Sequence, residues 1–236
     1  MLHNFVLLSI LYSAIIKRSF FYLRSAQTHH IQTIGGDMKV VARLKRAGAC
    51  ACVFSALVLA QSAFALDVGG VKIDETAKVG NQDLKLNGAG IRYKVIFKVY
   101  TAALYLADKK TTVPDVLAAP GARRIELVML RDVSSEDFSR AFMAGIQNNV
   151  DKADKSKIIN QLLKFGELFA SIPELKKGDV LTTDWIPGVG TQIHFNGKPV
   201  SETLPDQIFY NSLLKIWLGE KPADSKLKLS LLGQPG

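Results

Sequence analysis

The chain has 236 residues, of which 48% are hydrophobic and 22% charged, and its 30 Lys and Arg against 21 Asp and Glu give a formal net charge of +9. This composition is typical of a globular protein and argues against a disordered one. The positive charge is concentrated near the N-terminus, because residues 66–236 hold 23 basic and 20 acidic side chains, a net charge of +3. No basic run with interleaved aromatic residues remains there, so nucleic-acid binding is not expected.

The first 65 residues are typical of an export signal. From Met38 the sequence reads MKVVARLKRAGACACVFSALVLAQSAFA, in which a basic stretch precedes an apolar run and a small-x-small cleavage site that ends at Ala65. We predict a signal peptide over residues 38–65, which places the exported protein in the periplasm. Residues 1–37 are interpreted as a non-native extension before the true start. An uncleaved N-terminal membrane anchor is the alternative, although the apolar run is shorter than the roughly 20 residues that span a bilayer.

Few groups in residues 66–236 could hold a metal or act as a nucleophile. Both cysteines, Cys50 and Cys52, lie in the signal segment, so the remaining domain has no disulfide, thiolate site or cysteine nucleophile. A single histidine, His194, does not support a histidine metal cluster or a Ser-His-Asp triad. We therefore expect neither a metal nor a cofactor.

The domain is predicted to begin with strands. Residues 71–90 alternate weakly and are broken by a turn signal at Asn87-Gly88, which indicates short strands and turns. Residues 93–106 and 124–130 are rich in Val, Ile, Tyr and Leu. We predict that these two segments form central strands.

Helices are predicted to follow the strands. A capping residue, Ser134, precedes apolar residues at helical spacing, and residues 155–172 again place their apolar side chains on one broad face. The Asn-Gly pair at Asn196 predicts a hairpin, and a last helix is expected to end at Gly219. This order predicts an α+β fold, in which helices pack on a large antiparallel sheet.

One arginine stands at the start of an otherwise aromatic and aliphatic stretch, GAGIRYKVIFKVYTAALYL. The guanidinium of Arg92 stays charged at any working pH, and its planar donors suit a carboxylate or phenolate oxygen. We expect Arg92 to leave a Gly-Ala-Gly turn and to point into a cleft walled by Phe97, Val99 and Tyr105. The alternative is an ion pair with Asp or Glu at the sheet edge.

This stretch, together with the C-terminal segment DQIFYNSLLKIWLGEKPADSKLKLSLLG, resembles the chalcone isomerase family, and the resemblance covers about residues 71–233. It implies an open-faced β-sandwich, in which a layer of helices covers a large antiparallel sheet and leaves a cleft between the two. Some members of that family close a flavanone ring as intramolecular lyases, with the arginine stabilising an anion. Others bind fatty acids and use the arginine for the carboxylate.

The resemblance implies a site that this chain matches only in part. Arg92 matches the family arginine and Thr101 the threonine of the following strand, so these two are the catalytic candidates. The family's catalytic tyrosine falls near Phe138 and its asparagine near Gly145, which leaves both groups unmatched. A C-terminal Ser or Thr of the family aligns with Tyr210. The expected ligand-binding residues are Arg92, Thr101, Tyr105, Phe138 and Tyr210.

Three hypotheses of function follow. The first is an exported protein that binds a small amphipathic anion, fatty acid-like or phenolic, with its acidic head on Arg92 and its apolar body between sheet and helices. The second is an intramolecular lyase of the chalcone isomerase type with other hydroxyl or amide partners, drawn from Tyr93, Tyr100, Tyr105 and Asn148. The third is an interaction module of the cell envelope, in which Trp217 docks a partner.

Overall fold

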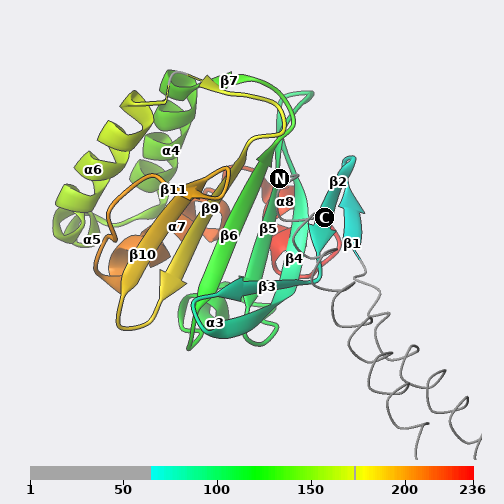
Figure 1. Cartoon of the computed structure of the whole chain (residues 1–236), viewed down its shortest axis with the longest axis horizontal. Coiled ribbons are helices and arrows are strands. Elements are labelled where there is room, and N and C mark those ends of the chain that lie inside the picture. Colours follow the sequence, from blue (N-terminus) through cyan, green and yellow to red (C-terminus); the bar gives the residue numbers. More distant parts are fainter. Residues whose placement is uncertain (1–64, 173) are drawn as a thin grey trace, which may run out of the picture. The chain divides into compact units, whose positions relative to one another are not determined.

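The computed structural model describes residues 65–172 and 174–236, so the expectations for the signal peptide and the extension before it lie almost entirely outside the described residues. Its centre is a seven-stranded antiparallel sheet in the order β11-β10-β9-β6-β5-β4-β3 (Figure 1). The strands of this sheet are β3 (Thr76–Val79), β4 (Gln82–Lys94), β5 (Phe97–Leu106), β6 (Arg123–Met129), β9 (Val180–Ile186), β10 (Gly190–Phe195) and β11 (Lys198–Pro199). Two short pairs complete the strands: β1 (Ala65–Val68) with β2 (Val71–Asp74), and β7 (Val133–Ser134) with β8 (Glu174–Leu175).

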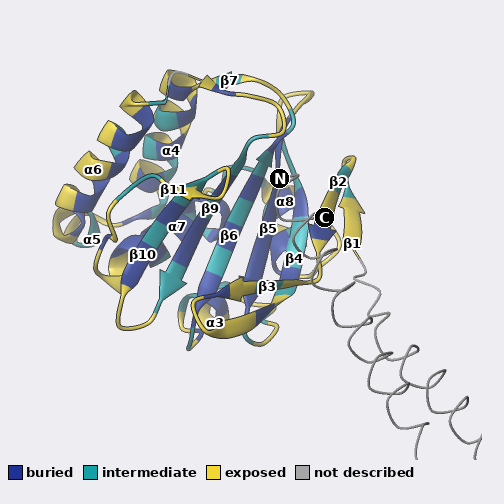
Figure 2. Ribbon diagram, in the orientation of Figure 1, coloured by how far each residue is buried: buried dark blue, intermediate teal, exposed yellow. Residues whose placement is uncertain are grey.

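Helices cover one face of the large sheet. They are α3 (Val113–Leu117), α4 (Ser135–Asn149), α5 (Lys152–Lys157), α6 (Ile159–Ala170), α7 (Gln207–Leu218) and α8 (Ser225–Leu231). The main core lies between this layer and the sheet, and Figure 2 shows the central strands β5 and β6 largely in the colour of buried residues. The predicted α+β fold, a layer of helices on a large antiparallel sheet, is confirmed. Within the described part of the chain, no helix has the length and apolar character to cross a membrane.

Strand β5 shows how the two faces of the sheet differ. Successive side chains of a strand point to opposite faces. Tyr100 and Ala102 therefore join the main core under the helices, whereas Ala103 and Tyr105 join a smaller core on the other face. The β1–β2 pair covers part of that second face, through residues such as Ile73.

The predicted strand over residues 93–106 was wrong in its first residues. It is a hairpin: β4 ends at Lys94, a two-residue turn follows, and β5 begins at Phe97. The turn places Val95 at a φ of 60°, a conformation that sequence reasoning assigns to Gly or Asn and not to a β-branched residue. The sequence therefore contains no turn signal at this position.

The Gly-Ala-Gly segment is not a turn, which corrects that prediction. It lies inside β4, where Gly88 and Gly90 face α8. A Cβ on Gly88 would lie 2.0 Å from the carbonyl oxygen of Ser230, and one on Gly90 would lie 2.7 Å from the Cβ of the same serine. The two glycines are needed because the helix backbone passes so close to the strand.

The helix predictions are largely confirmed. The Oγ of Ser134 accepts a hydrogen bond from the backbone N–H of Asp137 at 3.1 Å, and α4 begins at the next residue. The helix expected over residues 155–172 is divided into α5 and α6 at Ile158, and its expected end at Pro173 lies outside the described residues. Gly219 ends α7 as predicted. The short helix α3 was not predicted.

Candidate functional site

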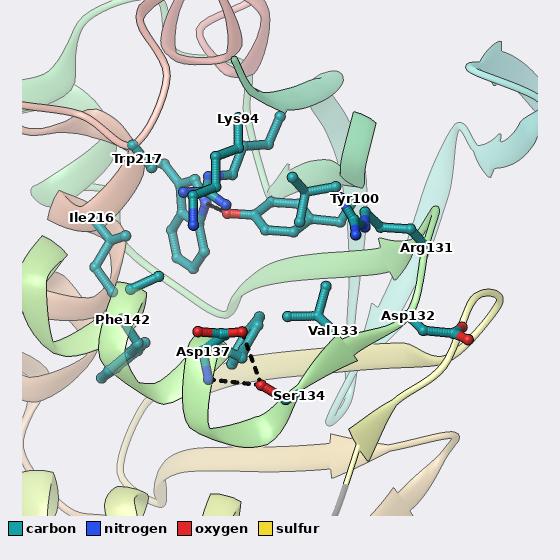
Figure 3. Close-up of a pocket in the computed structure, with 15 residues that line it drawn as sticks. Lys94, Tyr100, Arg131, Asp132, Val133, Ser134, Asp137, Phe142, Ile216 and Trp217 are labelled. Carbon is teal, nitrogen blue, oxygen red and sulfur yellow. Dashed lines mark hydrogen bonds between the residues drawn. The ribbon is translucent and has the colours of Figure 1, made fainter. Parts of the chain in front are cut away.

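A cleft with a volume of about 190 Å³ lies between the sheet and the helices where β4 ends and β5 begins (Figure 3). Its basic groups come from β4 and from the loop after β6, and its apolar walls come from α4 and α7. The basic residues are Arg92, Lys94 and Arg131. We call it the Arg92 cleft.

Arg92 reaches the cleft without an ion-pair partner. Its side chain is half-buried, and its Cζ lies 5.5 Å from the centroid of the Tyr100 ring, a cation–π distance. Among the described residues no carboxylate pairs with it, and its buried Nε has no hydrogen-bond partner. The alternative of an ion pair at the sheet edge is therefore not observed. A desolvated donor without an acceptor is available to a ligand.

The local structure explains why this arginine points into the cleft. Gly88, Gly90 and Arg92 share one face of β4, and α8 packs on the two glycines. The carboxylate of Asp224 caps the start of α8 and also accepts a hydrogen bond from the backbone N–H of Tyr93 at 2.9 Å. Arg92 thus projects just past the beginning of the helix. A register shift between Arg92 and Tyr93 marks the same point of the strand.

Tyr100 faces Arg92 directly across the hairpin. Its side chain is buried, and its hydroxyl accepts a hydrogen bond from the Nε1–H of Trp217 at 2.9 Å (Figure 3). Burial raises the pKa of Tyr100, although the charge of Arg92 and the Trp217 hydrogen bond act in the opposite direction. The phenol therefore stays protonated at neutral pH, and its own proton can be donated into the cleft.

The acidic groups of the cleft are already engaged. Figure 3 shows Asp137 and Ser134 on the wall opposite Tyr100. Asp137 forms an ion pair with Arg140 at 3.0 Å, and Asp132 accepts a hydrogen bond from the backbone N–H of Lys177 at 2.7 Å. The three basic residues of the cleft form no ion pair within the described ranges, so the cleft favours an anion.

The inner wall of the cleft is aromatic. Phe138, Phe142 and Trp217 line the cleft and also line a small void of about 10 Å³ deeper in the core. Phe142 stacks on Phe165 with ring centroids 3.8 Å apart, and Phe138 lies 5.0 Å from Phe169. An apolar chain that enters from the cleft thus meets mainly aromatic side chains at this wall.

Of the five predicted ligand-binding residues, the structure brings Arg92 and Phe138 together in this cleft. Thr101 and Tyr105 lie on the other face of the sheet. The Oγ1–H of Thr101 donates to the Val68 carbonyl at 3.2 Å, and the Tyr105 hydroxyl donates to that of Asp74 at 3.1 Å. Both side chains therefore attach the β1–β2 pair and do not line the cleft.

Tyr210 is fully buried in α7, where its ring lies 5.0 Å from the Cζ of Arg123 and away from the Arg92 cleft. Of the expected cleft walls, Val99 lines the cleft but Phe97 does not. Tyr100 was named only as one possible substitute, yet it is the hydroxyl at the site. The register of the two-residue hairpin places Tyr100 opposite Arg92. That register could not be derived from the sequence, because Val95 is an unusual residue for such a turn.

Packing explains why position 145 is a glycine and why Trp217 is not an exposed anchor. A Cβ at Gly145 would lie 2.8 Å from Cγ2 of Ile216, so the glycine permits the contact between α4 and α7 and leaves no space for an asparagine. Trp217 is buried in the cleft wall, which removes the exposed anchor of the interaction-module hypothesis. Asn148 is exposed and does not line the cleft.

Within residues 65–172 and 174–236, no group of three or more His, Cys, Asp or Glu side chains could hold a metal ion.

Comparison with known proteins gives one family and one fold. A sequence profile described as chalcone isomerase-like matches residues 65–233. A crystal structure of a fatty-acid binding protein from Arabidopsis thaliana is similar, with a TM-score of 0.56 and 18% sequence identity over 69% of this chain and 92% of that one. A search of curated proteins found no match.

Proposed function

This chain belongs to the chalcone isomerase-like family, and from that premise we propose that it binds a small amphipathic anion in the Arg92 cleft. The observation that carries the proposal is the half-buried guanidinium of Arg92, which has no acceptor within the described part of the chain and lies over the ring of Tyr100, whose hydroxyl is protonated. The acid class, fatty acid-like or phenolic, is part of the proposal, as is export to the periplasm.

In this proposal the two ends of the ligand contact different parts of the cleft. A carboxylate or phenolate between Arg92 and Tyr100 receives charge-assisted hydrogen bonds from the guanidinium and from the phenol, both in a partly desolvated site. The apolar body then lies against Phe138, Phe142 and Trp217. The volume of about 190 Å³ is below the ~300–1,000 Å³ of pockets that enclose drug-sized ligands, so a long chain requires the Phe138 and Phe142 rings to open the void behind them. The similar Arabidopsis structure is that of a fatty-acid binding protein, which supports a fatty acid as the first ligand to test.

The test is calorimetric titration of dodecanoate and of a phenolic acid into the protein and into two variants. Arg92→Gln should weaken binding roughly 10- to 100-fold, which corresponds to the ~1.5–3 kcal/mol of a hydrogen bond to a charged group. Lys72→Gln is the control, because Lys72 is an exposed cation of β2 that pairs with Asp67 and does not line the cleft. Unchanged affinity in Arg92→Gln, or no binding of either acid by the unsubstituted protein, would contradict the proposal.

An intramolecular lyase is the second candidate, and the observation that favours it is the phenol of Tyr100 in the cleft. This hydroxyl could take the place of the family tyrosine, whose position here is Phe138, while Arg92 stabilises the phenolate that attacks the enone. The absorbance of a chalcone should then decay faster with the protein than without it, and the excess rate should fall in Tyr100→Phe. Decay at the uncatalysed rate would exclude this candidate.

A further inference from the structure

The turn between β4 and β5 exposes three consecutive large apolar side chains. Val95, Ile96 and Phe97 are 89%, 78% and 56% exposed, and Figure 2 shows this turn in the colour of exposed residues. Single exposed apolar residues are common on protein surfaces, but consecutive ones at the end of a hairpin form a contact surface. We call residues 95–97 the apolar tip.

Folding alone does not explain the residue at the start of this turn. Val95 has a φ of 60°, and two-residue hairpin turns favour Gly, Asn or Asp where φ is positive. A β-branched side chain is strained in this region, and Val95 is also the most exposed large hydrophobic residue described. The valine therefore stabilises neither the turn nor the core, which points to a contact outside the molecule.

Basic side chains surround the apolar tip. Lys94 and Lys98 flank it in sequence, and the Cζ of Arg131 lies 5.2 Å from the centroid of the Phe97 ring. None of these three forms an ion pair within the described ranges. The nearby carboxylate of Asp224 is engaged by backbone N–H groups at the start of α8 and at Tyr93. An apolar tip within a ring of free cations is complementary to a bilayer surface that carries anionic head groups.

The apolar tip is continuous with the Arg92 cleft. Lys94 and Arg131 belong both to the basic surround and to the cleft lining, and Figure 3 shows them near Tyr100. We propose that the apolar tip inserts into an anionic membrane surface and holds the cleft entrance against the head groups, so that an amphipathic anion passes between bilayer and cleft. The identity of that cargo rests on the proposed function, whereas membrane docking does not.

The experiment places a fluorescent side chain at the tip of the whole chain and measures its contact with lipid. Ile96→Trp is compared with Val189→Trp, because Val189 is 54% exposed in the β9–β10 turn at the opposite end of the sheet. The unsubstituted protein gives the background from Trp185 and Trp217. The probe is a vesicle of phosphatidylcholine with about 30% phosphatidylglycerol, the anionic charge that attracts basic residues, and with brominated acyl chains that quench tryptophan.

Quenching of the Ile96→Trp signal should be several-fold stronger than that of the Val189→Trp signal. Since both variants carry residues 1–64, any membrane contact of that segment affects both equally. Adding Lys98→Gln to Ile96→Trp should weaken partition onto the anionic vesicles about fivefold, the contribution of one basic residue near such a surface. Equal quenching at positions 96 and 189, or equal quenching on vesicles without phosphatidylglycerol, overturns the proposal.

A separate readout distinguishes this inference from the proposed function. Ile96→Asp should lose most vesicle binding at the tip but should retain the affinity for dodecanoate in free solution, because Ile96 does not line the cleft. Arg92→Gln should keep vesicle binding at the tip but lose affinity for dodecanoate. A loss of dodecanoate affinity in Ile96→Asp would contradict the separation of docking and binding.

Discussion

Two arginines lie on the helix-covered face of the sheet, at its opposite ends, and each stands over a tyrosine ring. The Cζ of Arg92 is 5.5 Å from the centroid of Tyr100, and that of Arg123 is 5.0 Å from the centroid of Tyr210. Arg123 is fully buried, and its Nη1 donates to the carbonyls of Val116 and Leu117 and, at 2.9 Å, to Oδ1 of Asn211. Arg92 is half-buried and has no such acceptor among the described residues.

The difference separates a structural cation from a binding cation. A buried charge is tolerated when neighbouring groups solvate it, and Nη1 of Arg123 donates to the last carbonyls of α3, although its Nε and Nη2 have no partner among the described residues. Burial lowers the pKa of Arg123, as expected for a cation without a carboxylate beside it. Arg92 lies at the open cleft, where water or a ligand can satisfy it. An arginine over a tyrosine ring therefore stabilises packing at one end of the sheet and, we propose, recognises a ligand at the other.

The largest expected effect is on stability at the Arg123 end. Arg123→Met removes the three hydrogen bonds that Nη1 of the buried guanidinium donates, each worth about 1 kcal/mol, so the free energy of unfolding should fall by about 3 kcal/mol. Arg92→Met should lower it by less than about 1 kcal/mol. Urea unfolding followed by circular dichroism measures both. Equal losses in the two variants would remove the distinction between the two arginines.

A second test examines how the Arg92 end is held in place. Gly88→Ala puts a Cβ 2.0 Å from the Ser230 carbonyl, so α8 must shift, and we expect a loss of about 2 kcal/mol together with weaker dodecanoate binding. Gly166→Ala in α6 is the matched control. Outside its own helix, no atom of the described residues lies within 4 Å of the Cβ that alanine would add, and alanine in a helix interior should add ~0.5–1 kcal/mol of stability. A neutral Gly88→Ala would mean that α8 does not fix the position of Arg92.

Sequence reasoning reached the fold class, most helices and Arg92, because hydrophobic periodicity, capping residues and an isolated arginine are local signals. It misread the middle and the end of that arginine's strand, where tertiary contacts decide. Gly88 and Gly90 looked like turn residues but accommodate α8, and Val95 occupies a turn position that its side chain disfavours. With the turn missed, no pairing between β4 and β5 was predicted, and Tyr100 could not be recognised as the residue opposite Arg92.

The smallest expected effect compares the two tyrosines. Tyr100→Phe leaves the buried Nε1–H of Trp217 without an acceptor and should lower the free energy of unfolding by about 1–2 kcal/mol. It should also weaken dodecanoate binding about tenfold, which corresponds to ~1.4 kcal/mol for one lost hydrogen bond to a carboxylate. Tyr210→Phe removes a buried hydroxyl that has no partner among the described residues, so stability should stay within ~0.5 kcal/mol or rise, and binding should not change. Thermal unfolding and calorimetry on the two variants measure these differences. If Tyr210→Phe weakened binding as much as Tyr100→Phe, the ligand would extend to the Arg123 end, and the division between a structural and a binding arginine would fail.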